Sequence, residues 1–326
     1  MRIVLDAMGG DNAPDEIVKG ALKAQNDFKN TEIVLVGDEN QIKKFIPEGT
    51  NIEIIHTSET IGMDEDPLKA IKTKKNSSMV VGLDMVKKGE ADAFVSAGST
   101  GALIVGASLH VGRIRGIRRV ALGTVLPNNN KGCILLDCGA TMDCSAEFLT
   151  QFAFMGSIYM EQVIGVDNPR VGLLNVGVEE IKGNDVVKSA YNSIANTSLN
   201  FIGNVEARQF PDNACDVLIA DGFAGNVMLK AIEGTAGMMT SSIKAMLRRN
   251  TISMIAALML KGGLKEFKKM LDYKEHGGAP LLGANGAIIK AHGSSDARAI
   301  YNAIRQAIGY CEGNVTEKIE NYLKNQ

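Results

Sequence analysis

The sequence predicts an α/β fold, in which a mostly parallel sheet carries helices on both of its faces. Short apolar and β-branched runs alternate along the chain with longer stretches of helical periodicity, and this alternation is typical of parallel sheets connected by helices. Several of the short runs are nearly all apolar, as expected of strands that are covered on both faces. Glycine-rich turns follow the strands, and no repeat or low-complexity linker divides the chain. We therefore expect one unit over residues 1–326.

Seven short segments are predicted as strands because they are apolar or β-branched and end at turn residues. In chain order they are residues 2–5, 32–36, 51–55, 93–95, 133–136, 171–175 and 216–220. The spacing between them leaves room for a helical connection after most strands, as a parallel arrangement requires.

A helix is predicted between the first two strands. Pro14 suits its first turn, and Asp15 and Glu16 suit the positive end of a helix dipole. One apolar stripe at helical spacing is formed by Ile17, Ala21, Ala24 and Phe28. Further helices are predicted over residues 83–88, 102–111, 146–164 and 297–308.

The composition narrows the class of protein. The chain has 326 residues, 45% of them hydrophobic and 22% charged, which is ordinary for a folded globular protein. The net charge of -2 argues against a protein whose whole surface follows nucleic acid. Tryptophan is absent and aromatic residues make up 5%, so a stacking platform for single strands is not expected. The 35 glycines instead indicate turns at which the backbone approaches a ligand.

The cysteines and the N-terminus predict a cytoplasmic protein. Five cysteines, an odd number without a regular framework, fit free thiols in a reducing compartment. The apolar run at residues 3–5 is too short for a signal peptide. No uncharged apolar run reaches the ~20 residues that span a bilayer.

Four glycine-rich turns follow predicted strands, at residues 6–11, 96–101, 137–141 and 221–226. In open α/β sheets, ligands bind beyond the carboxyl ends of the strands, where helix N-termini point free N–H groups. The four turns together predict one crevice for an anionic ligand, although each alone also fits a tight strand-to-helix connection. The candidate binding residues in these turns are Asp6, Gly9, Gly10, Ser96, Gly98, Ser99, Thr100, Gly101 and Asp221, and Asn226 is a candidate catalytic residue.

Several familiar catalytic motifs are missing from the sequence. No G-x-x-x-x-G-K-[ST] loop is present, which disfavours a P-loop kinase or ATPase, and no G-x-G-x-x-G follows the first strand. The four histidines are scattered, and the cysteines lack the paired C-x-x-C spacing of a zinc site. A G-x-S-x-G nucleophile elbow is also missing. We expect neither a metal nor an organic cofactor.

Three cationic or imidazole side chains lie in or near glycine turns. Lys230 is four residues after Asn226 and so on the same helix face. Lys182 precedes Gly183, and His292 precedes Gly293 and Ser294 just before a predicted helix. Each can hold a phosphate, because lysine supplies a point charge and His292 and Ser294 supply hydrogen-bond donors. A solvated surface lysine, or a capping turn around Ser294, explains the same residues without a ligand.

Residues 240–275 are predicted as a basic and apolar helical hairpin. From 244 to 274 there are eight basic and two acidic residues, a local charge of +6. Within this segment residues 251–260 are uncharged, and the candidate membrane-contact residues there are Ile252, Ile255, Leu258 and Met259. Ten residues cannot span a bilayer, but an apolar tip with basic flanks can rest on anionic headgroups. A hairpin that buries these side chains in a dimer interface is the alternative.

The motifs as a series resemble the phosphate acyltransferases of bacterial phospholipid synthesis, the PlsX family. They run in family order from the first strand nearly to the C-terminus, so the resemblance covers essentially the whole chain. The matching segments are DAMGGD at 6–11, SAGSTGA at 96–102, GLLNVG at 172–177 with Asn175, Glu179 and Lys182, FIGNVE at 201–206, DGFAGN at 221–226, GGA at 277–279 and AHGSS at 291–295.

This resemblance implies a fold like that of isocitrate and isopropylmalate dehydrogenases, with two intertwined α/β lobes and a protruding helical hairpin. It implies that acyl-(acyl carrier protein) and inorganic phosphate give acyl phosphate and free carrier protein, without a cofactor. It also implies a homodimer at the inner face of the cell membrane, where the product feeds a glycerol-3-phosphate acyltransferase, and it favours membrane contact by the hairpin over the dimer alternative.

Phosphate can itself be the nucleophile on the thioester, so the protein's task is to hold an anion and stabilise the developing oxyanion. We expect the 98–101 turn, Asn226 and Lys230 to bind phosphate, Lys182 and Asn175 to complete that site or bind the oxyanion, and His292 to protonate the leaving thiolate. A ping-pong route through Cys138 is an alternative. Two other classes stay open, a nicotinamide-dependent dehydrogenase of the same fold and a non-catalytic membrane-associated regulator that binds acyl carrier protein.

Overall fold

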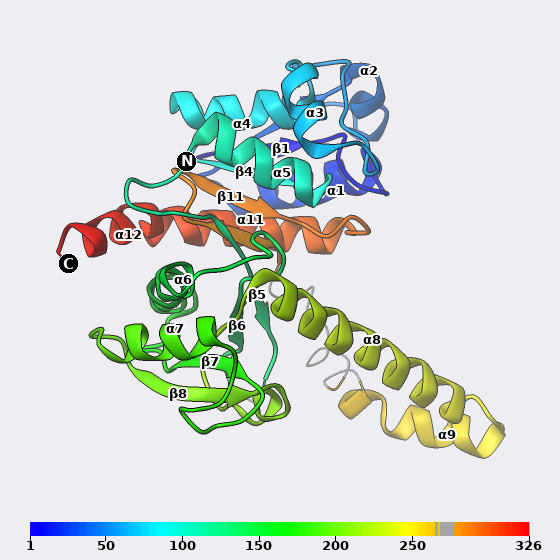
Figure 1. Cartoon of the computed structure of the whole chain (residues 1–326). Helices are drawn as coiled ribbons and strands as arrows, with labels where there is room; N and C mark the ends of the chain where they lie inside the picture. The colour runs from blue at the N-terminus through cyan, green and yellow to red at the C-terminus, as the bar shows by residue number, and fades with distance from the viewer. Residues whose placement is uncertain (129, 265–266, 268–276, 326) are drawn as a thin grey trace.

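The computed structural model describes residues 1–128, 130–264, 267 and 277–325 (Figure 1). The described residues form a sheet of 11 strands in the order β3-β2-β1-β4-β11-β10-β5-β6-β9-β7-β8. The strands are β1 (Arg2–Asp6), β2 (Glu32–Gly37), β3 (Glu53–His56), β4 (Ala93–Ser96), β5 (Ala121–Leu126), β6 (Cys133–Leu136), β7 (Val171–Asn175), β8 (Phe201–Glu206), β9 (Val217–Ile219), β10 (Ala279–Leu282) and β11 (Ala287–Lys290).

The sheet has two parallel blocks. In the first, β3, β2, β1, β4 and β11 all pair in parallel, and in the second β6, β9, β7 and β8 do so. The blocks are joined through β10 and β5, which pair antiparallel with each other and with their outer neighbours β11 and β6. The mostly parallel α/β sheet expected from the sequence is confirmed.

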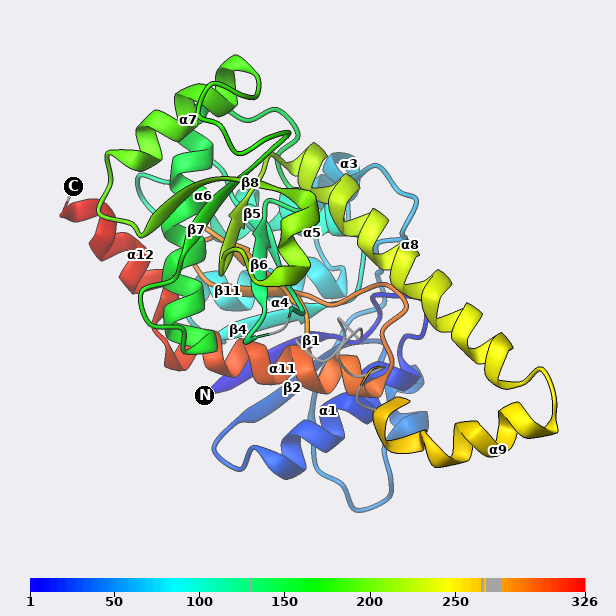
Figure 2. The ribbon, with the colours of Figure 1, turned by 90° about the horizontal axis from the view of Figure 1, so that it is seen from below.

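Helices cover both faces of this sheet (Figures 1 and 2). They are α1 (Asp15–Asp27), α2 (Glu39–Ile42), α3 (Pro67–Thr73), α4 (Ser78–Lys88), α5 (Thr100–Gly106), α6 (Ala146–Tyr159), α7 (Asp185–Ala195), α8 (Gly222–Leu247), α9 (Thr251–Met259), α11 (Ala297–Glu312) and α12 (Val315–Lys324). Shorter helical turns are η1 (Lys43–Phe45), η2 (Ala107–Val111), η3 (Met160–Ile164) and η4 (Ala207–Asp212).

Successive residues of a strand serve opposite faces, as the two-residue period of a strand requires. In β1, Ile3 and Leu5 join the hydrophobic cluster under α1, α6 and α11, whereas Val4 joins the cluster under α3, α4 and α5. A third cluster lies between the second block and the start of α8, and it includes Met228 and Leu229. The nearly all-apolar strands of the sequence are therefore buried on both sides.

The expected elements are present with shifted ends. The helix predicted at 83–88 begins at Ser78, where the Ser77 hydroxyl caps it, and the one predicted at 297–308 extends to Glu312. The helices predicted at 102–111 and 146–164 are α5 and α6, each continued by a π-helical turn. The third strand begins at Glu53, two residues after its predicted start.

A long helical arm projects from the α/β body of the molecule (Figures 1 and 2). It consists of the distal part of α8 and of α9, joined around Arg249 and Asn250, and Asn250 caps α9 through a side-chain bond from the Ser253 N–H. Part of the predicted hairpin, residues 265–266 and 268–275, lies outside the described residues. That part holds the predicted basic residues Lys265, Lys268, Lys269 and Lys274.

Candidate active site

Three glycine turns of the first block meet at the carboxyl ends of their strands. A Cβ placed on Gly9 would lie 2.7 Å from the Gly98 nitrogen, so the turns after β1 and β4 touch at positions where a side chain does not fit. Gly10 adopts a φ of +102°, a conformation that favours glycine. The Asp11 N–H then donates to the Gly293 carbonyl at 2.8 Å, which attaches the turn after β11.

Asp6 holds this junction together from beneath. Its carboxyl group is 2% exposed and accepts hydrogen bonds from the Ser78 hydroxyl at 2.6 Å and the Ser96 hydroxyl at 2.7 Å. The Ser96 hydroxyl in turn accepts from the Gly98 N–H at 3.0 Å. Burial raises the pKa of Asp6, and these hydrogen bonds oppose the shift. Asp6 and Ser96 therefore brace the turns in this structure.

The first turn of α8 packs against the turn after β6 in the second block. A Cβ on Gly225 would overlap the carbonyl oxygen of Asp137, so only glycine allows this approach. The buried Asp137 carboxyl accepts from the backbone N–H groups of Leu122 at 2.9 Å and Thr141 at 2.6 Å. Burial raises the pKa of Asp137 to about 6. A Cβ on Gly139 would lie 3.6 Å from Cγ of Asn226, which shows that the two turns lie side by side.

A cavity of about 500 Å³, with both polar and apolar residues in its wall, lies where the turns of both blocks meet. Five of the predicted site residues line it, namely Thr100, Gly101, Asn226, Lys230 and His292. Its wall also contains Asp11, Cys138, Gly139, Glu233, Lys290 and Ser295. Segments as far apart in the chain as Asp11 and Ser295 thus contribute to one cavity, and the four predicted turns, 6–11, 96–101, 137–141 and 221–226, are all represented in it.

Two polar groups of this smaller cavity have local partners. The Lys230 ammonium pairs with Glu233 at 2.7 Å, one turn further along α8. His292 Nδ1 lies 2.9 Å from the Ser294 hydroxyl and accepts from the Ser294 N–H at 3.2 Å. Ser294 thus contacts the His292 imidazole and its part in phosphate binding stays a prediction, whereas Asp296 caps α11 by accepting from the Ala299 N–H at 2.9 Å.

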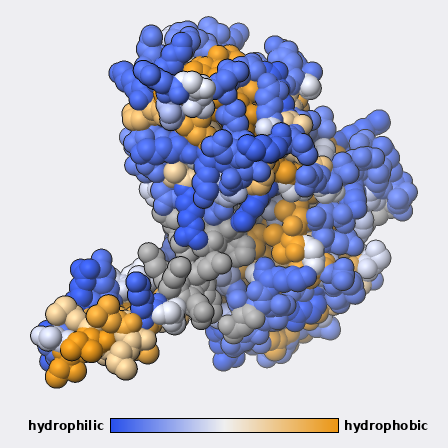
Figure 3. All heavy atoms as spheres, turned by 180° about the vertical axis from the view of Figure 1, so that it is seen from behind, coloured by the Kyte–Doolittle hydropathy of each residue, from blue (hydrophilic) through white to orange (hydrophobic). Residues whose placement is uncertain are grey.

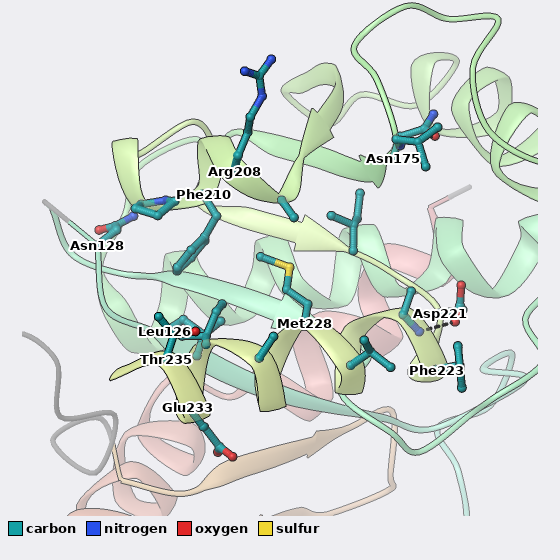
Figure 4. A pocket seen from close by; sticks show the side chains of 18 of the residues that line it. Leu126, Asn128, Asn175, Arg208, Phe210, Asp221, Phe223, Met228, Glu233 and Thr235 are labelled. Carbon is teal, nitrogen blue, oxygen red and sulfur yellow. Dashed lines mark hydrogen bonds between the residues drawn. The ribbon is translucent and has the colours of Figure 1, made fainter. Parts of the chain in front are cut away.

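A larger and mainly apolar cavity of about 1030 Å³ lies on another side of α8 (Figure 4). Met228 from α8 and Phe210 from η4 point into it, whereas Arg208 points away. Apolar residues dominate its lining, among them Leu126, Leu174, Val187, Phe223, Val227 and Ile232. The smaller cavity takes Asn226, Leu229 and Lys230 from the same helix, so adjacent sides of α8 serve the two cavities.

The structure places Asn175 and Asp221 at the larger cavity and not with the other predicted binding residues. The Asn175 amide donates to the Lys182 carbonyl oxygen at 3.0 Å, and Asp221 caps α8 by accepting from the Ala224 N–H at 2.8 Å. Lys182 is exposed on the loop between β7 and α7 and lines neither cavity within the described chain. The expectation that Lys182 completes a site with Asn226 stays a prediction.

The remaining predicted binding residues surround the smaller cavity without lining it in the described chain. Asp6, Gly9, Gly10, Ser96, Gly98 and Ser99 form the packed turns behind Thr100 and Gly101. Ser99 caps α5 by accepting from the Ala102 N–H at 3.5 Å. Sequence reasoning missed Lys290 and Ser295, and the signal for Lys290 was a lysine that ends an apolar run directly before a glycine turn.

The thiol of Cys138 lies in the wall of the smaller cavity and is 3% exposed. It donates to the Leu135 carbonyl oxygen at 3.2 Å, and burial raises its pKa to about 12. A nucleophilic cysteine needs its thiolate form, which this environment disfavours. Across the described residues, no group of three or more His, Cys, Asp or Glu side chains is arranged to hold a metal ion.

Solved structures with the same fold include several acyl-group transferases. A phosphotransacetylase from Streptococcus pyogenes matches with a TM-score of 0.64 at 18% identity, covering 95% of this chain and 94% of the other. A branched-chain phosphotransacylase from Enterococcus faecalis matches with a TM-score of 0.58 at 13% identity over 95% and 99%. A 4-hydroxythreonine-4-phosphate dehydrogenase from Burkholderia phymatum reaches 0.53 at 12% identity over 94% and 97%. The fold is that of the phosphotransacylases and of related dehydrogenases.

Sequence comparison narrows this class to one family. The model of the family described as "Fatty acid synthesis protein" matches residues 1–318. The phosphate acyltransferase of Thermoanaerobacterium thermosaccharolyticum is 50% identical over 99% of this chain and 97% of its own length. The phosphate acyltransferase of Clostridioides difficile is 48% identical over 99% and 96%. The chain belongs to the phosphate acyltransferase family of fatty acid and phospholipid synthesis, and the resemblance inferred from its motifs is confirmed.

Proposed function

We propose that this enzyme converts acyl-(acyl carrier protein) and inorganic phosphate to acyl phosphate and free carrier protein, as a step toward phosphatidic acid. The observation that carries the proposal is the pair of cavities along α8. The smaller one has Asn226, Lys230 and His292 in its wall, which suits an anion. The larger one is apolar and of a size that suits a fatty acyl chain.

In the proposed reaction, an oxygen of hydrogen phosphate attacks the thioester carbonyl carbon. The new C–O bond forms as the C–S bond breaks, the thiolate leaves with the carrier, and the proton of the hydrogen phosphate ends on that sulfur. Asn226 and Lys230 hold the phosphate, and Lys182 with Asn175 stabilises the carbonyl oxygen as it gains charge. His292 relays the proton to the thiolate. This proton transfer contributes little to the rate, because a thiolate whose thiol has a pKa near ~8.5 is a good leaving group.

The decisive experiment measures release of free carrier thiol from acyl-(acyl carrier protein) with and without inorganic phosphate, together with acyl phosphate by ³¹P NMR. We expect both products only when phosphate is present. Release of thiol without phosphate, or binding of the carrier without release, would reject the proposal. A Cys138→Ala protein should retain activity, because the buried thiol is not expected to carry the acyl group; a trapped acyl group on Cys138 would reverse this assignment.

We propose that the acyl chain occupies the larger cavity. Ala231 lines this cavity from an exposed position on α8, so Ala231→Trp fills it without replacing a core residue. The ratio of kcat/KM for long-chain over short-chain donors should fall at least about fivefold. Thr240→Trp, at an exposed position of the same helix that lines neither cavity in the described chain, serves as the control. An unchanged ratio in Ala231→Trp would place the chain elsewhere.

We further propose a homodimer that associates peripherally with the inner face of the cell membrane and delivers its product to a glycerol-3-phosphate acyltransferase. Large apolar side chains on the loop after β7 support a subunit contact, since Val176 is 80% and Ile181 is 79% exposed. Sedimentation should give twice the mass of one chain. The membrane contact is proposed for α9, because its apolar side chains Ile252, Leu258 and Met259 are exposed.

A further inference from the structure

Lys290 is a buried lysine at the carboxyl end of β11, in the wall of the smaller cavity. It is 6% exposed. Its ammonium group donates to the carbonyl oxygens of Ala97, at 3.3 Å, and of Ala291. Removing an ammonium group from water is costly unless it is paired with an opposite charge. In the part of the chain that the structure describes, no carboxylate lies within ion-pair distance of Lys290.

The charged groups around Lys290 leave its ammonium poorly compensated. Asp6 and Asp11 are near enough to favour the charged form, yet burial outweighs them and lowers the pKa of Lys290 to about 8. Asp6 is already bound by two serine hydroxyls, and Glu233 pairs with Lys230 across the cavity. The direct partners of this buried cation are neutral oxygens, so a bound anion would supply the negative charge that it lacks.

Ser295 supplies a second and independent observation. It lines the same cavity, is 2% exposed, and its hydroxyl has no hydrogen-bond partner among the described residues. Leaving a buried hydroxyl unpaired costs free energy, so such groups in folded proteins call for an explanation. A cation and an unsatisfied hydroxyl that line one cavity form the charge and hydrogen-bond donor set of an oxyanion site.

We propose that Lys290 and Ser295 bind the inorganic phosphate substrate, with Lys290 as its principal counter-charge. The proposal rests on the proposed function, because it assigns the phosphate of that reaction to the smaller cavity. It commits to free phosphate and not to the phosphodiester of the carrier's prosthetic group, because Lys290 lies buried among the turns and the carrier arrives from outside. Lys290 then keeps its charge when phosphate is bound.

The test compares Lys290→Met, which keeps much of the side-chain volume, with the wild-type enzyme. Calorimetric titration with inorganic phosphate alone should show at least about tenfold weaker binding, and the KM for phosphate should rise by a similar factor. The KM for acyl-(acyl carrier protein) should stay within about twofold. Ser295→Ala should weaken phosphate binding about threefold or more. Lys19→Met, at an exposed position that pairs with Asp15 and lines neither cavity, should leave all these values unchanged.

The pH dependence of phosphate stabilisation provides a second measurement, which is made first on the wild-type protein. The rise in Tm produced by inorganic phosphate should shrink as the pH passes above about 8, where free Lys290 loses its charge. Other ionisable groups lie near Lys290: the cavity wall also contains Asp11, Lys230, Glu233 and His292, and Asp6 lies behind it. The pH profile of Lys290→Met therefore separates the part due to Lys290 from the part due to these groups. That variant should show a smaller phosphate stabilisation, without the loss above pH 8 that is due to Lys290.

Unchanged phosphate affinity in Lys290→Met would overturn the proposal, as would a rise in the KM for the acyl donor alone. The results distinguish a failure of this proposal from a failure of the proposed function. If the wild-type enzyme makes acyl phosphate but the variant binds phosphate normally, the proposed function stands and Lys290 is not its phosphate ligand. If the wild-type enzyme binds phosphate through Lys290 but makes no acyl phosphate, the proposed function fails instead.

Discussion

Asn226 presents its side chain to the smaller cavity from the first turn of α8, beside the Gly139 turn. Lys182 lies on the loop that also positions Asn175 at the larger cavity. If these two side chains act in the transition state, Asn226→Ala and Lys182→Ala should each lower kcat at least about tenfold, or ~1.4 kcal/mol of barrier. Steady-state kinetics at saturating phosphate measure this. The exposed positions Asn192→Ala and Lys188→Ala are matched controls. Wild-type rates in Asn226→Ala and Lys182→Ala would end these assignments.

Lys290 also predicts a pH dependence of stability. Its pKa is about 8 in the folded protein against 10.5 for the ordinary side chain, so the unfolded chain binds more protons between those values. The stability due to this residue is therefore present above pH ~10.5 and is lost as the pH falls to ~8. Without phosphate, Lys290→Met should exceed the wild-type protein in unfolding free energy by up to about 3 kcal/mol at pH 7. Denaturant melts at pH 7 and pH 10 test this; a less stable variant would indicate a structural role.

At the residue level the sequence predicted the turns better than it predicted the side chains within them. Thr100, Gly101, Asn226, Lys230 and His292 share a cavity because strands of a sheet bring their carboxyl ends together. Asn175 and Asp221 line the other cavity, whose described walls come from β5, the second block and α8, and tertiary packing decides which side of α8 a loop residue meets. Lys290 was missed for a related reason, since burial of a lysine is a property of the tertiary fold.

At the level of elements, two glycines of α8 differ in their surroundings: Gly225 is tightly packed and Gly234 has open space around it. Gly225 allows the first turn to touch the Asp137 carbonyl, so Gly225→Ala should displace Asn226 and reduce both Tm and activity. Gly234 lies exposed in the same helix with open space at its Cβ position. Gly234→Ala should therefore raise stability by roughly 0.5–1 kcal/mol and leave activity unchanged. Thermal melts of both variants provide the comparison, and a harmless Gly225→Ala would contradict the packing argument.

Four strands of the structure, β5, β8, β10 and β11, were not predicted from the sequence. Two of them, β5 and β10, pair antiparallel with each other between the two parallel blocks. Alternation of strand and helix predicts parallel neighbours, and it does not predict strands from distant parts of the chain that pair between two parallel blocks. Whether these blocks behave as two intertwined lobes remains a prediction from the resemblance.

At the scale of the whole molecule, the arm of α8 and α9 extends from the body and ends in an apolar surface (Figure 3). Leu258 is 72% and Met259 is 84% exposed, Ile252 is 79% and Ile255 is 56% exposed, and basic residues Lys244, Arg248 and Arg249 lie nearby in sequence. None of the helices that the structure describes is long and apolar enough to cross a membrane. Exposed apolar residues with basic neighbours favour contact with an anionic lipid surface.

Leu258→Glu tests that contact. The substitution places a carboxylate where we expect insertion into the headgroup region, so co-sedimentation with anionic vesicles should fall at least about tenfold, since burying a leucine contributes ~1.5–3 kcal/mol. Activity toward soluble acyl carrier protein should be retained. Ser241→Glu, at an exposed position of α8 and outside α9, adds the same charge and controls for repulsion by the vesicles. Unchanged pelleting of Leu258→Glu would return the hairpin to a role in the subunit interface.

The account as a whole depends on one site, the smaller cavity at which turns from both blocks meet. A crystal structure of the active enzyme soaked in inorganic phosphate tests it most directly. We predict one tetrahedral anion in that cavity, within hydrogen-bond distance of the Asn226 side chain and the Lys290 ammonium group. An empty cavity in crystals of an enzyme that makes acyl phosphate, with the anion bound elsewhere, would contradict the account.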